Sequence, residues 1–103
     1  MIVKRIEIKI STGWYGLFKS NLLLLDRKTA NQAQNLRDLL SYKHRVTDGK
    51  YHETYFRHWF KDEFLAEFNL PKLVKGIRIR SKRIKKGSAY YEDDSQVVLK
   101  ADL

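Results

Sequence analysis

The chain contains no cysteine among its 103 residues, so neither a disulfide nor a thiolate metal site can stabilise it. Its five glycines are dispersed and do not form a loop that could cradle a phosphate. The longest aliphatic run is the leucine stretch at 22–25, far short of the roughly 20 residues that span a bilayer. The N-terminus alternates charged residues with isoleucine, unlike a secretory signal. We therefore expect a cytoplasmic protein with no membrane partner.

Histidine is also scarce, which bears on metal binding. His44, His52 and His58 are the three histidines, and no two of them stand at the i, i+4 spacing that places two ligands on one helical face. Without cysteine and without a compact cluster of histidines and carboxylates, we expect neither a metal site nor another cofactor.

The composition is that of a folded domain. Hydrophobic residues make up 43% of the chain, and thirteen residues are aromatic. A chain of this length can bury one core of its own, but not two independent ones. We expect a single basic domain over residues 1–103.

Positive charge is concentrated in one segment. The formal net charge is +9, and residues 72–86 carry eight of the twenty-one basic side chains and no acidic one. The basic residues of this segment are Lys72, Lys75, Arg78, Arg80, Lys82, Arg83, Lys85 and Lys86. Such a density of charge favours a polyanionic partner, and nucleic acid is the commonest one.

Hydrophobic periodicity predicts the elements of the N-terminal half. Residues 2–10 alternate isoleucine with mostly charged residues, as in a strand with one buried face. Residues 14–25 fit either a second strand or a short helix. Thr29 and Gln32 match a capping box, which predicts a helix over about residues 30–44 with Ala33, Leu36 and Leu40 on its buried side.

In the C-terminal half, aromatic residues recur at steps of three and four between residues 51 and 70, which predicts a second amphipathic helix that ends before Pro71. Residues 74–84 then alternate as a strand, with Ile77 and Ile79 facing the core. Ile84 has the opposite parity, so the strand ends near Lys82 or a bulge resets its register. A return strand begins at Tyr90 and continues through residues 97–99.

The element order ββααββ predicts an α+β fold, a two-layer sandwich in which an antiparallel sheet of about four strands carries two helices on one face. We expect one shared core. Its predicted members are Ile6, Ile8, Leu36, Leu40, Phe56, Trp59, Phe60, Phe64, Ile77 and Ile79.

The favoured function is binding of DNA or RNA without catalysis. A basic C-terminal β-hairpin over residues 74–91 would contact the phosphate backbone, with Arg78, Arg80 and Lys82 about 6.6 Å apart in one outward row. Tyr90 lies beside the basic turn and could stack on an unpaired base. A simpler interpretation of the charge is protection of an edge strand, for which one or two lysines suffice.

Two other functions stay open. The basic hairpin could dock on an acidic protein, as an interaction module or an inhibitor does. A small metal-independent ribonuclease is less favoured, and it would draw on His52, Glu53, Arg57 and His58 if these share a cleft. The acidic run at residues 92–94 either neutralises the basic turn or leaves it free, and the sequence alone does not decide between these.

Overall fold

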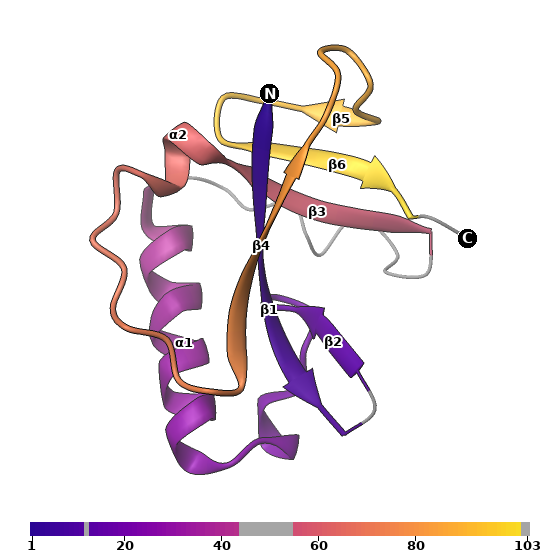
Figure 1. Cartoon of the computed structure of the whole chain (residues 1–103). Helices are drawn as coiled ribbons and strands as arrows, with labels where there is room; N and C mark the ends of the chain where they lie inside the picture. Colours follow the sequence, from indigo (N-terminus) through magenta and orange to yellow (C-terminus); the bar gives the residue numbers. More distant parts are fainter. Residues whose placement is uncertain (12, 44–54, 102–103) are drawn as a thin grey trace.

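The computed structural model describes residues 1–11, 13–43 and 55–101, and it has an α+β fold with one six-stranded antiparallel sheet and two α-helices (Figure 1). In chain order the elements are β1 (Ile2–Ile10), β2 (Gly13–Gly16), the 3-10 turn η1 (Leu22–Leu24), α1 (Arg27–Lys43), β3 (Phe56–Lys61), α2 (Asp62–Leu65), β4 (Ile77–Arg83), β5 (Tyr91–Glu92) and β6 (Gln96–Lys100).

Strand β1 organises the sheet. Along one edge it pairs with β4 over seven residues. Its other edge is shared, because residues 7–10 pair with β2 while Val3 and Lys4 pair with β3. The sheet continues from β3 to β6 and then to β5. It therefore forks at Arg5, between the two strands that share this edge.

The helix α1 covers one face of the sheet. Ala33, Leu36 and Leu40 pack on Ile6 and Ile8 of β1 in the first core cluster. Asp26 caps the helix, since its carboxylate accepts hydrogen bonds from the Thr29 backbone N–H and from the Thr29 hydroxyl. These bonds lower the pKa of Asp26.

The predicted capping box of Thr29 and Gln32 is wrong, because the helix begins three residues earlier than expected. Gln32 instead holds the connection between α2 and β4 against α1. Its amide nitrogen donates to the Lys72 carbonyl at 2.9 Å, and its Oε1 accepts from the Val74 N–H at 2.8 Å.

The opposite face of the sheet has a second, smaller core. Val3, Trp59, Val97 and Leu99 are buried there, with Met1, Ile84 and Ala89 packed against them. The expectation of one shared core is thus wrong for Trp59, while Ile79 is 37% exposed and Phe56 is only half-buried. Ile84 continues the parity of Arg80 and Lys82 and packs against this second core, so no bulge is needed.

The predicted helix over residues 51–70 is also wrong. Residues 51–54 lie outside the described part of the chain, and the remainder forms β3 followed by the four-residue helix α2. On β3, Phe60 faces the first core and the adjacent Trp59 faces the second. Apolar residues of both parities hide the alternation of a strand and resemble a helical stripe.

The pairing of the basic strand corrects the predicted topology. The chain does contain hairpins, formed by β1 with β2 and by β5 with β6. However, β4 pairs with β1, so residues 74–91 do not form a hairpin of their own. The four-strand ββααββ order is replaced by six strands. Residues 14–25 give only the short strand β2 and the turn η1. Within the described residues, no helix has the length and apolarity to cross a membrane.

Candidate nucleic-acid interface

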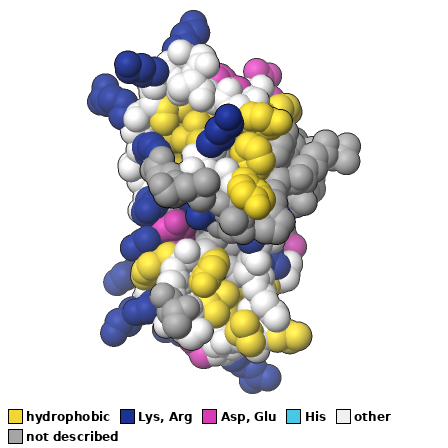
Figure 2. All heavy atoms as spheres, turned by 90° about the vertical axis from the view of Figure 1, so that its right-hand side faces the viewer, with side chains coloured by type: hydrophobic (Ala, Val, Ile, Leu, Met, Phe, Trp, Pro, Cys, Tyr) yellow, Lys and Arg dark blue, Asp and Glu magenta, His cyan; other side chains and the backbone are white. Residues whose placement is uncertain are grey.

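The basic residues of β4 share the face of the sheet that α1 does not cover. The register sets Arg78, Arg80 and Lys82 opposite Glu7, Arg5 and Val3 of β1, and cross-strand partners point to the same side. Ile77 faces the first core instead. The structure therefore confirms that Arg78, Arg80 and Lys82 share one face and that Ile77 faces the core, whereas Ile79, which was also expected in the core, is 37% exposed. Figure 2 shows Lys and Arg side chains gathered along one edge of this face, beside hydrophobic side chains.

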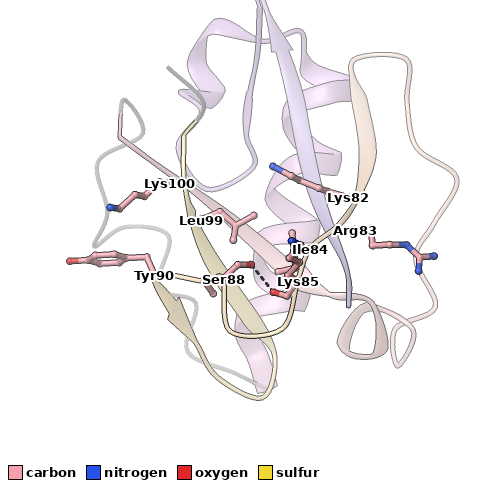
Figure 3. Close-up of a pocket in the computed structure, with 9 residues that line it drawn as sticks. Lys82, Arg83, Ile84, Lys85, Ser88, Tyr90, Leu99 and Lys100 are labelled. Carbon is pink, nitrogen blue, oxygen red and sulfur yellow. Dashed lines mark hydrogen bonds between the residues drawn. The ribbon is translucent and has the colours of Figure 1, made fainter.

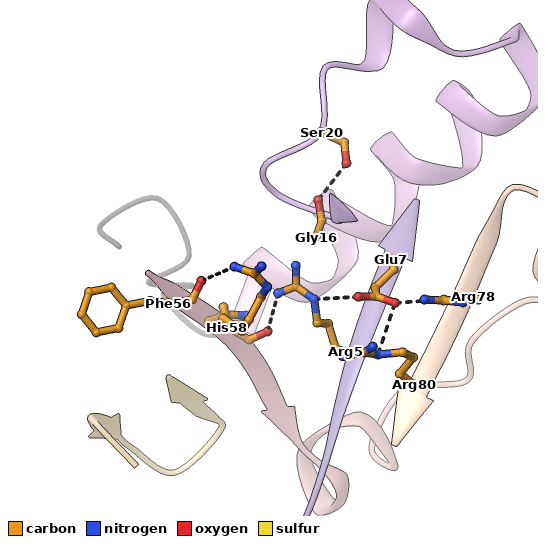
Figure 4. A network of polar contacts seen from close by, with 9 residues as sticks. Arg5, Glu7, Gly16, Ser20, Phe56, His58, Arg78 and Arg80 are labelled. Carbon is orange, nitrogen blue, oxygen red and sulfur yellow. Dashed lines mark hydrogen bonds and ion pairs between the residues drawn. The ribbon is translucent and has the colours of Figure 1, made fainter. Parts of the chain in front are cut away.

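One buried carboxylate, that of Glu7, binds Arg78 and Arg80 of β4 and also Arg5 of β1 (Figure 4). Glu7 is 4% exposed, and its Oε2 accepts a hydrogen bond from Arg5 Nε at 3.0 Å. Its Oε1 accepts from Arg78 Nε at 2.9 Å and lies 3.4 Å from Arg80 Nε. Three guanidinium groups surround this single carboxylate, so the four residues together keep a positive charge. Because Arg78 and Arg80 are bound to Glu7, they are less free to meet a ligand than the sequence suggested.

Arg5 fills the fork between β2 and β3. It is 3% exposed, and its Nη1 donates to the His58 carbonyl at 3.1 Å. A Cβ atom on Gly16 would lie 2.9 Å from Arg5 Nη2. The guanidinium therefore bridges the two halves of the sheet, and it is a structural group.

The outward cations lie over indole rings. The guanidinium carbon of Arg78 is 4.1 Å from the centre of the Trp14 ring, and that of Arg80 is 5.3 Å from the Trp59 ring. Lys82 Nζ lies 5.9 Å from the same Trp59 ring. These cation–π contacts hold the side chains against the sheet, where their charge stays accessible.

Beyond β4 the surface is hollowed (Figure 3). A concave site of about 610 Å³ is lined by Lys82, Arg83, Ile84, Lys85, Ser88, Ala89, Tyr90, Leu99 and Lys100. A smaller hollow of about 210 Å³ adjoins it, and is lined by Arg57, Trp59, Arg80, Lys82, Leu99, Lys100 and Ala101. Lys82, Leu99 and Lys100 belong to both. We call the two hollows together the basic groove, since six cations and no carboxylate line them.

Trp59 forms part of the smaller hollow, and its polar atom is unusual. The indole Nε1 is the only buried side-chain nitrogen or oxygen without a hydrogen-bond partner in the described parts of the chain. An unpaired buried donor costs about 1–3 kcal/mol. This unpaired indole N–H, at the edge of the basic groove, therefore destabilises the second core by that amount.

The structure divides the nine predicted binding residues into separate groups. Lys82, Arg83, Lys85 and Tyr90 line the basic groove, Arg80 lines its smaller hollow, and Arg78 lies beside Trp14. Lys86 is exposed in the turn that follows β4. Lys72 and Lys75 lie by the start of α1, where Lys75 and Lys28 line another hollow.

Sequence reasoning missed two cations of the groove. Arg57 and Lys100 lie outside the basic segment, on β3 and β6. They reach the groove because β6 pairs with β3 and places Leu99 opposite Arg57. No spacing in the sequence indicates this pairing.

Two residues of the acidic run at 92–94, Glu92 and Asp93, are engaged away from the groove. Glu92 forms an ion pair with Lys61 at 2.7 Å. Burial raises the pKa of Asp93, but hydrogen bonds from the Ser95 backbone and from the Gln96, Tyr91 and Ser95 side chains outweigh it and lower the pKa to about 2. Asp93 thus shapes the β5–β6 turn.

The described members of the predicted ribonuclease set do not share a cleft. His58 is buried, with Nε2 2.8 Å from Gln96 Oε1 and its ring at the edge of Phe60. Its neighbour Arg57 lines the groove on the opposite face of β3. His52 and Glu53 lie outside the described residues.

In the part of the chain that the structure describes, no group of three or more histidines and carboxylates is placed to hold a metal ion. Comparison with known proteins found no matching family model, no matching curated protein and no matching solved structure.

Proposed function

We propose that the protein binds nucleic acid through the basic groove, without catalysis. The observation that carries the proposal is the composition of its lining. Arg57, Arg80, Lys82, Arg83, Lys85 and Lys100 surround the two adjoining hollows, and no acidic side chain lines either of them.

A concave surface of this kind suits a chain of phosphates. Low-dielectric walls such as Ile84, Ala89 and Leu99 strengthen the field of the cations that surround them. Each phosphate that a cation neutralises releases condensed counterions, and this release favours binding at low salt. Lysines that only protect the edge of a strand would not need to converge on a hollow.

A matched pair of charge variants tests the proposal. The first replaces Lys82, Lys85 and Lys100 by Gln, and all three are exposed lining residues. The control replaces Arg27, Lys28 and Lys75 by Gln, which removes the same charge at the start of α1. Affinity for a mixed-sequence oligonucleotide is measured by fluorescence anisotropy over a range of salt concentrations.

The groove variant should bind more weakly than the control. The slope of log affinity against log salt should become shallower by about 2.7 for duplex DNA, or about 2.1 for a single strand, if all three lysines contact phosphates. Equal losses in both variants would show that net charge alone is responsible. Absence of salt-dependent binding to DNA and RNA would overturn the proposal, and a stoichiometric complex with an acidic protein would then be the alternative.

A further inference from the structure

We infer that the outer edge of β4, the edge that faces away from β1, binds an acidic, extended segment of a partner protein, which joins the sheet as a further antiparallel strand. The inference goes beyond nucleic-acid binding in the basic groove, and neither depends on the other. It follows from the direction of the backbone groups of β4, from the exposure of Ile79, and from the charges of the strand.

The ladder between β1 and β4 fixes the direction of these backbone groups. At one end of it the Lys9 N–H donates to the Gly76 carbonyl at 2.9 Å, and at the other the Ile84 N–H donates to the Met1 carbonyl at 2.9 Å. In an antiparallel ladder, every second residue of a strand directs both of its backbone groups to the same neighbouring strand. The even-numbered residues of β4 therefore bond to β1.

The odd-numbered residues of β4 direct their backbone groups to the outer edge. Within the described residues, β4 pairs with β1 and with no other strand. In the same part of the chain, nothing hydrogen-bonds to the N–H and C=O groups of Ile79 and Ser81. A row of such groups is the template on which an extended peptide adds to a sheet.

Ile79 lies within this edge and is 37% exposed. Its cross-strand partner on β1 is Ile6, which is only 2% exposed. The apolar row on this face of the sheet thus continues as far as β4 and is partly uncovered there. An apolar side chain on an added strand would lie beside Ile79 and extend the row by one more strand.

The charges of β4 decide which strand can be added. If a second copy paired edge to edge with its antiparallel β4, centred on Ser81, Arg80 of each copy would lie opposite Lys82 of the other. Like charges opposite each other destabilise a sheet, so self-pairing is disfavoured. Acidic residues on the added strand would instead be attracted to these cations. The edge therefore fits a segment that alternates acidic residues with apolar ones.

A synthetic peptide that alternates glutamate with valine, blocked at both ends and labelled with a fluorophore, is the probe. Fluorescence anisotropy measures its affinity for the full chain. In the inferred register the valines lie opposite Ile79 and Ser81 and direct their N–H groups to β4, whereas the glutamate N–H groups point away. N-methylation of the valines should weaken binding roughly tenfold, because each blocked N–H loses a hydrogen bond. N-methylation of the glutamates should change the affinity little.

Two variants test the edge itself. Ser81→Pro removes one outward N–H and no bond to β1, so it should weaken peptide binding about fivefold. Ile79→Ser removes the apolar contact and should weaken binding about threefold. Leu39→Ser, at a 38% exposed leucine of α1, is the control and should leave the affinity unchanged. Thermal melting checks that each variant is folded.

A scrambled peptide of the same composition separates strand pairing from attraction between charges. It should bind more weakly than the alternating peptide at every salt concentration. Equal binding of these two peptides, equal effects of the two N-methylation patterns, or no binding at millimolar peptide would overturn the inference. A peptide affinity that neither Ser81→Pro nor Ile79→Ser changes would do so as well. None of these results bears on the basic groove, which is tested with nucleic acid.

Discussion

Arg78 donates from Nε to Glu7 Oε1 at 2.9 Å, although the two residues are 71 positions apart in the chain. The same carboxylate binds Arg5, which is buried in the fork of the sheet. Glu7 therefore links a structural cation to the cations of the outer face. Its loss should affect the fold before it affects any ligand.

Replacement of Glu7 by Ala should lower the free energy of unfolding by about 3–5 kcal/mol, because it leaves the Arg5 guanidinium buried without its counterion. Urea denaturation followed by tryptophan fluorescence measures the change. Glu67→Ala, at an exposed carboxylate of the segment after α2, is the matched control and should stay within about 0.5 kcal/mol.

The double variant Arg5→Met with Glu7→Leu sharpens this test. Apolar side chains of similar volume often replace a buried ion pair without loss of stability, so the double variant should recover most of what Glu7→Ala loses. If Glu7→Ala is as stable as the wild type, the carboxylate does not neutralise Arg5, and the assigned role is wrong.

The two glycines of β2 offer a second matched pair. A Cβ atom at Gly16 would lie 2.9 Å from Arg5 Nη2, whereas one at Gly13 would have its nearest neighbour at 3.8 Å. Since Arg5 is bound to Glu7 and to the His58 carbonyl, it cannot move without breaking these bonds. Gly16→Ala should cost about 1–3 kcal/mol in the same denaturation experiment. Gly13→Ala should be nearly neutral, and equal effects would contradict this role of Arg5.

How far the sequence predicts the fold depends on how each element is buried. The helix α1 has one apolar stripe, and the isoleucines Ile6 and Ile8 of β1 and Ile77 of β4 lie in the first core, so the period of each element can be read from the sequence. The strand β1 keeps its alternation although both of its faces are buried, because the second face buries the charged residues Arg5 and Glu7. In β3, His58 and Phe60 are buried on one face and Trp59 on the other. A strand with aromatic or other apolar residues on both faces shows no alternation of apolar and polar residues, and the recurrence of its aromatic residues at steps of three and four then suggests a helix.

The candidate site likewise has features that depend on local sequence and features that depend on which strands pair. Arg78, Arg80 and Lys82 point to the same side because side chains alternate along a strand, and this local property was predictable from the sequence. The contact of Glu7 with Arg78 depends on the pairing of β4 with β1, and the position of Lys100 depends on the pairing of β6 with β3. Strand partners are a long-range property, and a single sequence of this kind does not encode them in any readable spacing.

Phe60 tests the first core. It is 3% exposed and its ring contacts those of Phe18, His58 and Phe64. Phe60→Ala removes most of a buried ring and should cost about 3–5 kcal/mol, a large share of the stability of a domain of this size. Leu23→Ala, at a 92% exposed position of η1, should leave the melting temperature unchanged. An unchanged melting temperature for Phe60→Ala would place the ring outside the core.

Asp93 should make the stability of the fold sensitive to acid. Its pKa falls from 3.8 to about 2 in the folded chain, because hydrogen bonds from Ser95, Gln96 and Tyr91 to the ionised carboxylate outweigh the effect of burial. A group whose pKa is lower in the folded state stabilises the fold above its unfolded pKa, and this stabilisation is lost as the pH falls toward the folded value. Asp93→Asn should therefore melt at a lower temperature than the wild type above about pH 5. The difference should shrink as the pH falls from about 4 to 2.

Melting curves of both proteins between pH 2 and pH 7 measure this difference, and the two proteins differ at no other carboxylate. Asp94→Asn is the control, because Asp94 is exposed and is not one of the residues that hydrogen-bond to Asp93. It should show no difference of this kind at any pH. A deficit of Asp93→Asn that persists undiminished at pH 2 would show that the turn depends on the shape of the side chain. The negative charge would then contribute nothing, since the protonated carboxyl of the wild type would serve as well as the ionised one.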